Sequence, residues 1–491
     1  MSRTTHLENG QILLDVRTRT FSRSLTIRDG KVVGIDCSAV NGCNLINLQG
    51  KFALPAFVDS HVHLVEGASG IGDIDVSSVT SKTSFTALFC STISNNQDGD
   101  WIVGFGWRQE RLGELPDSSW FPKRIEVPML CYSNDYHSAV LNETALKSLP
   151  LTEIQAMNGG KYIRQGLVQE DALYSGVCPL VPELEVKTRR ERVLQTLKRM
   201  QSQGIVLLGS MEDLSDVKEI LNFLDLPSLM RIRVMLLDSP TEEIIASISE
   251  LKGEFLKVIG FKAFLDGSLG SRTARMYEPW LDTDGNGLWS GLVKSGGLQN
   301  WANDVARAGY APIMHAIGDA AVGEALNVID NLDSSSGARI EHAQFIANKD
   351  VEALSNKMFA VQPLHQPYDA AIAFEAVGSK RKSQLYNWRR MLDAGARLSF
   401  GSDWPVAEAS PLSAIRVAIN NGLTVDEALY ASTIEAAQSL GVNKGGSLEI
   451  GFNGDVVVLD ENPFECDWKV NQPSVTMTIL GGKVVFKKED E

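Results

Sequence analysis

The two ends of the chain share a pattern of short apolar segments separated by turn residues. Asp29–Gly30, Asn453–Gly454 and Gly481–Gly482 each lie between two such segments. Dipeptides of this kind close two-residue hairpins between antiparallel strands. Because both ends are rich in strands and surround a different middle, we predict one small β-sandwich domain built from residues 1–53 and 441–491.

The middle of the chain, residues 54–440, alternates short apolar runs with longer helical stretches. This alternation is typical of βα units, which form a parallel sheet. Helices are predicted at Arg189–Ser202, Asp319–Leu332 and Arg381–Ala394. Strands are predicted to end near His61, Leu208, Leu236, Ala263, His315, His342, Gln362 and Asp403. Eight such units predict an α/β fold, a TIM-like (β/α)8 barrel.

One connection, at about 66–187, is much longer than a single crossover between neighbouring parallel strands. It contains Trp101, Trp107 and Trp120 together with several apolar runs, so we expect it to be folded. We predict an inserted cap subdomain on the catalytic rim, where it would cover the site and shape its specificity.

The charge and cysteine content narrow the class of protein. Lys and Arg number 46 against 61 Asp and Glu, a net charge of −15. This balance argues against nucleic acid or an anionic membrane as the main partner. The first residues lack a basic-then-apolar signal, and no run of about 18 apolar residues occurs. The 6 Cys show no CxxC spacing, which indicates reduced thiols in a cytoplasmic protein.

Ionisable residues recur at the predicted strand ends. His61 and His63 are two residues apart on the first strand, so both imidazoles can face the barrel axis and bind one ion. Two partly buried structural histidines are the alternative for this pair alone. Further candidates on other strands are Lys262, His315, His342 and Asp403. Because functional groups of barrel enzymes collect at the C-terminal strand ends, the set as a whole indicates a metal centre.

These residues and their surrounding motifs resemble the amidohydrolase superfamily. The segments LPAFVDSHVH (54–63), FLDGSLGSRTA (264–274), HAIGDAA (315–321), RIEHAQ (339–344) and FGSDWPV (400–406) are similar to a branch that includes N-substituted formamide deformylases. The similarity extends from about Gln11 to Phe486, so it covers almost the whole chain. It implies a (β/α)8 barrel enzyme that hydrolyses a small molecule.

The resemblance also implies how the ligands are divided. His61, His63 and Asp403 would bind a first divalent metal ion, and His315 and His342 a second. Lys262, carbamylated by CO2, would bridge the two ions, whereas an unmodified lysine would leave a one-metal site. An ion pair between Lys262 and Asp266 or another carboxylate is the structural alternative. The ligand types suit Zn best, with Mn, Fe or Co as alternatives.

The chemistry follows from the charge of the ion. Water bound to a zinc-like ion drops its pKa from about 15.7 to about 7, which supplies hydroxide at neutral pH, and the ion polarises the substrate carbonyl. Asp403 is expected to take the proton of that water and pass it to the leaving amine.

Two further residues, His137 and Arg272, are candidates for substrate contacts, and a third, Glu170, matches a motif of the family. His137, in SNDYHSAVLNETAL, resembles a motif of the family; a surface or helix-capping role is the alternative. Arg272, after the fourth strand, could bind a carboxylate or form a salt bridge with a nearby acid. Glu170, in GLVQEDA, also matches a motif of the family, but the sequence assigns it no role.

Gln362 and His365 follow the seventh strand in VQPLHQPYD and are expected to face the rim. Trp107 could wall the pocket, although filling the core of the insertion is the better expectation.

We therefore predict a metal-dependent hydrolase of a small-molecule C–N bond in an amide, formamide or cyclic amide. A mononuclear deaminase and an ester or carbamate hydrolase are alternatives on the same fold. A catalytically inactive scaffold is a third, disfavoured because all six ligand positions are filled. The resemblance also implies a homodimer.

Overall fold

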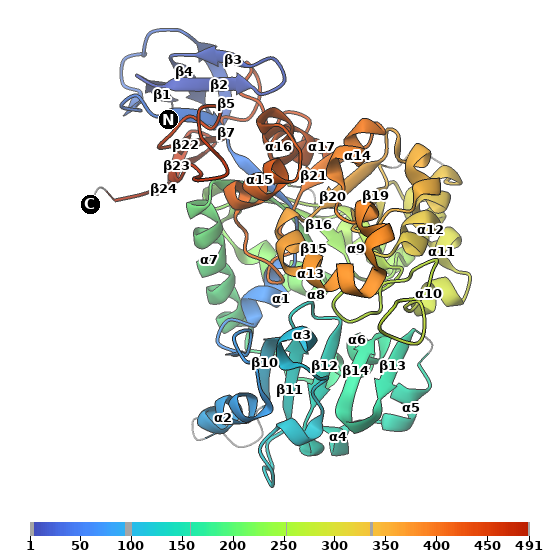
Figure 1. The fold of residues 1–491 in the computed structure, drawn as a ribbon. Helices are drawn as coiled ribbons and strands as arrows, with labels where there is room; N and C mark the ends of the chain where they lie inside the picture. Colours follow the sequence, from blue (N-terminus) through green and yellow to red (C-terminus); the bar gives the residue numbers. More distant parts are fainter. Residues whose placement is uncertain (1–3, 94–100, 158, 252, 334–336, 490–491) are drawn as a thin grey trace.

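We analysed a computed structural model of the chain, which describes residues 4–93, 101–157, 159–251, 253–333 and 337–489. It has three parts (Figure 1). An eight-stranded barrel occupies the centre, a small β-domain that contains both termini lies on one side, and a separate six-stranded sheet lies on another. The predicted fold class, a barrel with a terminal β-domain and an inserted cap, is confirmed.

The barrel strands follow the chain in order around a parallel sheet. They are β8 (Phe57–Val62), β15 (Ile205–Glu212), β16 (Arg231–Leu236), β17 (Leu256–Phe264), β18 (Ala311–Ala316), β19 (Arg339–His342), β20 (Met358–Val361) and β21 (Arg397–Phe400). Each ends within a few residues of the position that the sequence predicts.

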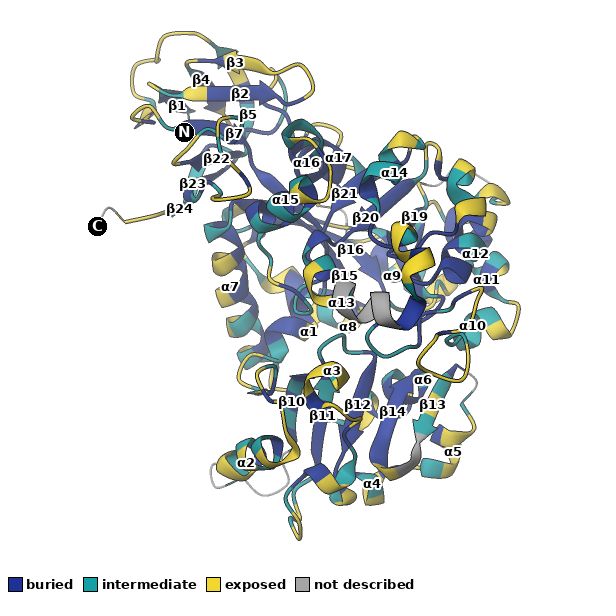
Figure 2. Cartoon of the chain, in the orientation of Figure 1, coloured by how far each residue is buried: buried dark blue, intermediate teal, exposed yellow. Residues whose placement is uncertain are grey.

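Helices surround the barrel, and α7, for example, has one buried and one exposed face (Figure 2). They are α1 (Leu64–Ser69), α7 (Val186–Ser202), α8 (Leu214–Glu219), α9 (Glu242–Ile248), α10 (Gly291–Lys294), α11 (Leu298–Arg307), α12 (Asp319–Asp330), α13 (Gln366–Val377), α14 (Trp388–Asp393), α15 (Pro411–Asn420), α16 (Val425–Ser432) and α17 (Ile434–Ser439). Among the described residues, no helix is long and apolar enough to cross a membrane.

The single helix predicted at Arg381–Ala394 is wrong. A 3-10 helix at Ser379–Gln384 ends, and α14 begins separately at Trp388. Tyr386 between them has a φ of 48°, outside the helical range. The side chain of Asn387 accepts a hydrogen bond from the backbone N–H of Arg390 and so caps a new helix.

The first and last strands meet through hydrogen bonds at the C-terminal end of the barrel. The Ser60 hydroxyl donates to the carbonyl of Phe400 at 2.8 Å. Beyond the end of β21, the N–H of Asp403 donates to the carbonyl of His61, and that of His63 to the carbonyl of Trp404, both at 2.8 Å. These bonds place Asp403 directly beside the histidines of the first strand.

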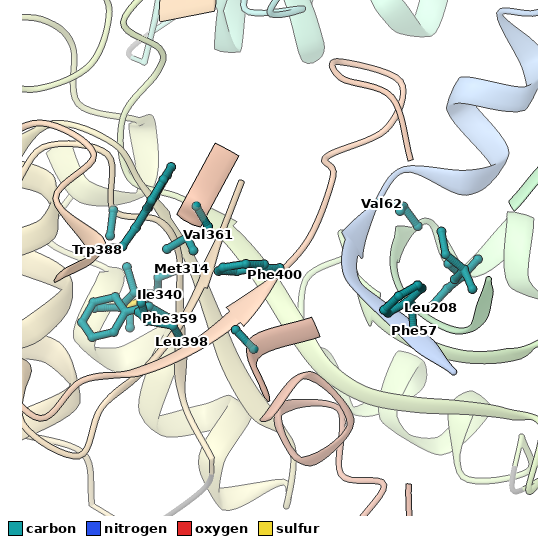
Figure 3. Packing of buried hydrophobic residues seen from close by; sticks show 14 of the residues in the cluster. Phe57, Val62, Leu208, Met314, Ile340, Phe359, Val361, Trp388, Leu398 and Phe400 are labelled. Carbon is teal, nitrogen blue, oxygen red and sulfur yellow. The ribbon is translucent and has the colours of Figure 1, made fainter. Parts of the chain in front are cut away.

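Apolar side chains of the barrel strands form two groups in the view of Figure 3, one that includes Phe57 and Leu208 and one that includes Ile340 and Phe359. Phe57, Leu208, Ile340 and Phe359 are fully inaccessible to solvent and belong to one large cluster. The same cluster includes residues of the surrounding helices, so it packs the strands against the helices and keeps the strand ends in fixed positions.

The β-domain consists of two sheets, with strand orders β5-β4-β1-β6 and β24-β23-β22-β7-β2-β3. Leu7 and Leu25 of one sheet pack with Ile12 and Val456 of the other in a buried core, as in a β-sandwich. The strands are β1 (Thr4–Glu8), β2 (Gln11–Asp15), β3 (Thr20–Ser22), β4 (Leu25–Arg28), β5 (Lys31–Ile35), β6 (Asn44–Asn47), β7 (Phe52–Pro55), β22 (Val456–Leu459), β23 (Val475–Leu480) and β24 (Lys483–Lys487).

The turns at Asp29–Gly30 and Gly481–Gly482 close hairpins as predicted. The hairpin at Asn453–Gly454 is wrong, because the residues before it form turns rather than a strand. Their backbone pairs with the N-terminal half of the domain instead: the N–H of Val32 donates to the carbonyl of Phe452 at 2.9 Å.

The insertion folds around its own sheet, with strand order β13-β14-β12-β11-β10-β9. Apolar clusters lie against it, one around Phe85 and Trp120 and another around Leu141 and Leu173. Its elements are β9 (Ile74–Asp75), α2 (Lys82–Ile93), β10 (Ile102–Trp107), α3 (Gln109–Leu112), β11 (Met129–Ser133), β12 (Ser138–Leu141), α4 (Glu143–Ser148), α5 (Leu151–Gln155), β13 (Gly160–Ile163), β14 (Leu167–Glu170) and α6 (Asp171–Tyr174). We refer to it as the cap.

Candidate metal centre

The C-terminal ends of β8 and β21 bring His61, His63 and Asp403 together. The Nε2 atoms of His61 and His63 lie 3.0 and 3.4 Å from Oδ1 of Asp403. Asp403 has a φ of 58°, a left-handed conformation that is uncommon for aspartate. This local turn directs its carboxylate into the site.

The other carboxylate oxygen of Asp403 faces a different pair of histidines. Its Oδ2 lies 4.0 Å from Nδ1 of His342, at the end of β19, and 3.8 Å from Nε2 of His365, in the turn after β20. The ring of His342 also lies 4.5 Å from that of His315 and 4.9 Å from that of His61, centroid to centroid. Asp403 is therefore at the centre of the group.

Lys262 lies on β17 beside these residues, with its ammonium Nζ 5.2 Å from the centre of the Phe264 ring. Among the described residues, Nζ has no hydrogen-bond partner although it is buried. Burial lowers the pKa of Lys262 to about 8. Asp266, the alternative partner, instead accepts backbone hydrogen bonds from Arg275, Ile317 and Gly318.

A second set of groups fixes the orientation of the histidine rings. Nδ1 of His61 bonds to the carboxylate of Glu341, which accepts a 2.6 Å bond from Arg339. Gln362 Oε1 lies 2.8 Å from Nδ1 of His342, and the carbonyl of Gly267 lies 3.1 Å from Nε2 of His315. Such partners set the tautomer of a ligating histidine and raise its basicity.

The protonation states suit a metal centre. Burial lowers the pKa of His315 and His342 well below the usual value, and the neutral imidazole is the form that binds metal. Burial raises the pKa of Asp403, but the neighbouring His61 and His63 outweigh it and hold this pKa well below the usual value. Asp403 is therefore ionised, as a metal-binding carboxylate must be.

The donor set fits a divalent cation. Buried nitrogens without a hydrogen-bond partner in the described part of the chain include His61 Nε2, His63 Nδ1, Lys262 Nζ and His365 Nε2. Buried polar atoms are rarely left unpaired, so several around one carboxylate indicate a missing ligand. Two groups have their donor atoms within 4.8 Å of one another: His61, His63 and Asp403, and His342, His365 and Asp403.

The cap contributes a buried pair to the same region. His137 Nδ1 lies 3.0 Å from Oε2 of Glu170, and the rings of His137 and His315 are 5.1 Å apart. Burial lowers the pKa of His137, but the Glu170 carboxylate outweighs it and raises the pKa to about 9. Asp135 next to this pair accepts hydrogen bonds from Ser268 and Ser271, which ties the cap to the loop after β17.

Two of the residues predicted from the sequence have other partners. The guanidinium of Arg272 forms an ion pair with Asp282 at 2.8 Å and donates to the carbonyl of Leu269. Trp107 is buried in the core of the cap, where its Nε1 donates to the carbonyl of Cys131 at 2.9 Å. Neither side chain joins the histidine group around Asp403.

Three further residues of the site were not singled out by the sequence analysis. Arg339, Glu341 and Gln344 all lie in the RIEHAQ motif and are buried around His61 and His365. For Arg339 and Glu341 the available signal was their charge within a predicted barrel strand, since charged residues are seldom buried without a partner.

Glu212, at the end of β15, gives a prediction about stability. Burial raises its pKa well above the usual value of 4.5, so folding favours the protonated form. Its contribution to stability is thus present at low pH and lost as the pH rises through the folded-state pKa. Glu212→Gln should raise the midpoint temperature of unfolding at pH 8, by an amount that corresponds to about 1 kcal/mol or more in the free energy of unfolding. Near pH 4 the substitution should have no effect.

Thermal unfolding followed by fluorescence between pH 4 and 9 measures this difference. Glu219→Gln, which changes an exposed residue at the end of α8, is the matched control and should leave the pH profile unchanged. Equal midpoints for Glu212→Gln and the parent chain at pH 8 would contradict the prediction.

Comparison with known proteins agrees with this geometry. Residues 44–486 match the amidohydrolase family, Amidohydro_3. The chain is 31% identical to the protein LONG AFTER FAR-RED 3 of Arabidopsis thaliana, over 97% of this chain and 91% of that one. It is 22% identical to the N-substituted formamide deformylase of Arthrobacter pascens, over 92% and 91% of the two chains.

Among solved structures, the chain resembles an uncharacterised metal-dependent hydrolase of Pyrococcus furiosus. The TM-score is 0.73 at 26% identity, over 94% of this chain and all of that chain. An uncharacterised metal-dependent hydrolase of Pyrococcus horikoshii has a TM-score of 0.75 at 25% identity, over 95% of this chain and 99% of that chain. With a family match over most of its length and a His–Asp centre at the barrel mouth, the chain belongs to the amidohydrolase family and is a metal-dependent hydrolase.

Proposed function

We propose that the enzyme hydrolyses a non-peptide C–N bond of a small molecule, in a formamide, another amide or a cyclic amide. The observation that carries this proposal is the position of the Asp403 carboxylate between two groups of histidines at the barrel mouth. The full-length similarity to an N-substituted formamide deformylase supports it. So does a match of 37% identity to a probable imidazolonepropionase of Xenopus tropicalis, which covers 21% of the chain.

The residues divide the work as follows. His61, His63 and Oδ1 of Asp403 would hold one divalent ion, for which zinc is the preferred choice and Mn, Fe or Co are alternatives. An ion held there supplies hydroxide at neutral pH and polarises the substrate carbonyl. Asp403 accepts the proton released from the attacking water and delivers it to the departing nitrogen. His137, held by Glu170, faces the same region from the cap and is placed to contact the substrate.

A second ion would lie between His315 and His342, with Lys262 as a carbamate between the two positions. The unpartnered Nζ of Lys262 supports this arrangement, because a carbamate bound to metal removes the cost of a buried, unpaired ammonium. A site without the carbamate would hold one ion, which favours deamination. Ester or carbamate hydrolysis remains the other alternative on this fold.

Metal removal tests the proposal directly. Protein purified without chelators is measured for metal content, then dialysed against a chelator and assayed with N-substituted formamides, cyclic amides, esters and aminopurines. We expect turnover of the formamides or cyclic amides, its loss on dialysis and its recovery when Zn²⁺ is returned. His61→Ala, treated identically, should not recover. Turnover restricted to aminopurines or esters would support the alternatives, and no metal after reconstitution would favour an inactive scaffold.

A further inference from the structure

The two oxygens of the Asp403 carboxylate face opposite groups of ligands. Oδ1 lies within 3.4 Å of His61 and His63, whereas Oδ2 lies 4.0 Å from His342 and 3.8 Å from His365. Nδ1 is the nitrogen of His342 that faces Oδ2, and it donates to Gln362, so His342 would bind an ion through Nε2. A carboxylate with one oxygen toward each of two sets of histidines has the geometry of a bridging ligand. Three-ligand positions then exist on both sides of Asp403.

His365 is held in place by the chain around it. It ends the 3-10 turn Pro363–His365 directly after β20, and only 7% of its surface is exposed. Its Nδ1 lies 3.2 Å from the Gln344 side chain, which directs Nε2 toward Asp403. The rings of His342 and His365 are nearly parallel, at 16° with 6.3 Å between their centres. Both rings therefore lie within 4.0 Å of Oδ2.

The unpaired atoms around His365 are explained by a cation. Its Nε2 and the Oε1 atom of Gln344 are both buried without a hydrogen-bond partner among the described residues. A half-turn of the Gln344 amide group exchanges the oxygen and nitrogen atoms that face His365. Oε1 of Gln344 then accepts a hydrogen bond from Nδ1–H of His365, and the lone pair of His365 Nε2 is free to bind a metal ion.

We propose that His365 is a metal ligand, which completes a second cation position with His342 and Oδ2 of Asp403. The proposal rests on the metal-dependent function above and extends it, because the second position then has three protein ligands apart from Lys262. His315 can still join this position, since its ring lies 4.5 Å from that of His342. Imidazole and carboxylate are the donors that Zn²⁺ and Co²⁺ prefer in such sites.

The test measures metal binding rather than turnover. The parent chain, His365→Gln and the control His6→Gln, which changes a histidine of the β-domain bonded to Thr26, are stripped of metal. Each is then titrated with Co²⁺ while visible absorption and bound metal per chain are followed. We expect two ions in the parent chain and the control. In His365→Gln the first ion should bind as before, and the second should bind at least about 100-fold more weakly.

His365→Cys separates a ligand from a merely structural residue. A thiolate at this position restores a soft donor, so Cd²⁺ should bind to the second position with a thiolate-to-metal charge-transfer band. His365→Gln should not show this band. Circular dichroism of the metal-free variants establishes that each is folded before the titrations are compared.

The outcomes separate this inference from the proposed function. Two ions bound to His365→Gln with parental affinity would overturn it and leave His365 as a partner of Asp403 in proton transfer. One ion in the parent chain would also overturn it, while leaving metal-dependent hydrolysis intact. No ion in the parent chain would overturn both.

Discussion

Replacing Asp403 by asparagine is expected to abolish turnover while the protein remains folded. The change removes the charge that faces both histidine pairs, and with it the acceptor for the proton of the attacking water. Loss of a positioned acid–base group alone costs roughly 10²- to 10⁴-fold in rate, and weakened metal binding adds to this. Steady-state kinetics on the best substrate, together with metal content per chain, measures the effect.

The matched control is Asp304→Asn, which makes the same chemical change at an exposed position of α11. It should have parental kinetics and metal content. Near-parental activity of Asp403→Asn with full metal occupancy would show that Asp403 is not the proton carrier, and the metal ligands would need reassignment.

Replacing Lys262 by alanine is expected to remove metal together with activity. If Lys262 carries a carbamate, the variant lacks an anionic ligand, and the buried cavity left behind has room for a small acid. Acetate or propionate should therefore restore part of the metal content and part of the rate. Titration of the variant with each acid, followed by elemental mass spectrometry and an activity assay, measures this rescue.

Lys257→Ala is the control on the same strand, since Lys257 is an exposed residue of β17. This variant should keep its metal, and added acids should change neither its metal content nor its rate. Full metal occupancy in Lys262→Ala without any acid would show that no bridging carbamate exists, in which case Lys262 would act as an ammonium beside the site.

The barrel could be predicted from the sequence because short strand-like segments alternate with helical stretches through the middle of the chain. His315 lies next to the last residue of β18 and His342 ends β19, so their position at the catalytic rim follows from the topology of the barrel. The break between Ser379–Gln384 and α14 could not be predicted, because it depends on the local conformation of Tyr386 and on a cap at Asn387.

Parts of the site depend on contacts between distant segments, which no local pattern encodes. The bond from His61 to Glu341 joins residues 280 positions apart. The partner of Arg272 was equally open, since its guanidinium could reach a substrate or Asp282, and only the path of the loop decides between them. The cap and the rim loops determine which substrate binds, and no sequence motif predicts their shape.

The meeting of the first and last barrel strands has a consequence for how the enzyme matures. Ser60 and Phe400, which join them, are 340 residues apart in the chain. At about 5 to 20 residues per second, a ribosome takes roughly 20 to 70 s to cover that interval. His61 and His63 are therefore made long before Asp403, and a site that uses all three is complete only in a nearly finished chain. An ion bound there would stabilise the contact between the first and last strands, because a ligand that binds only the folded state adds to its stability.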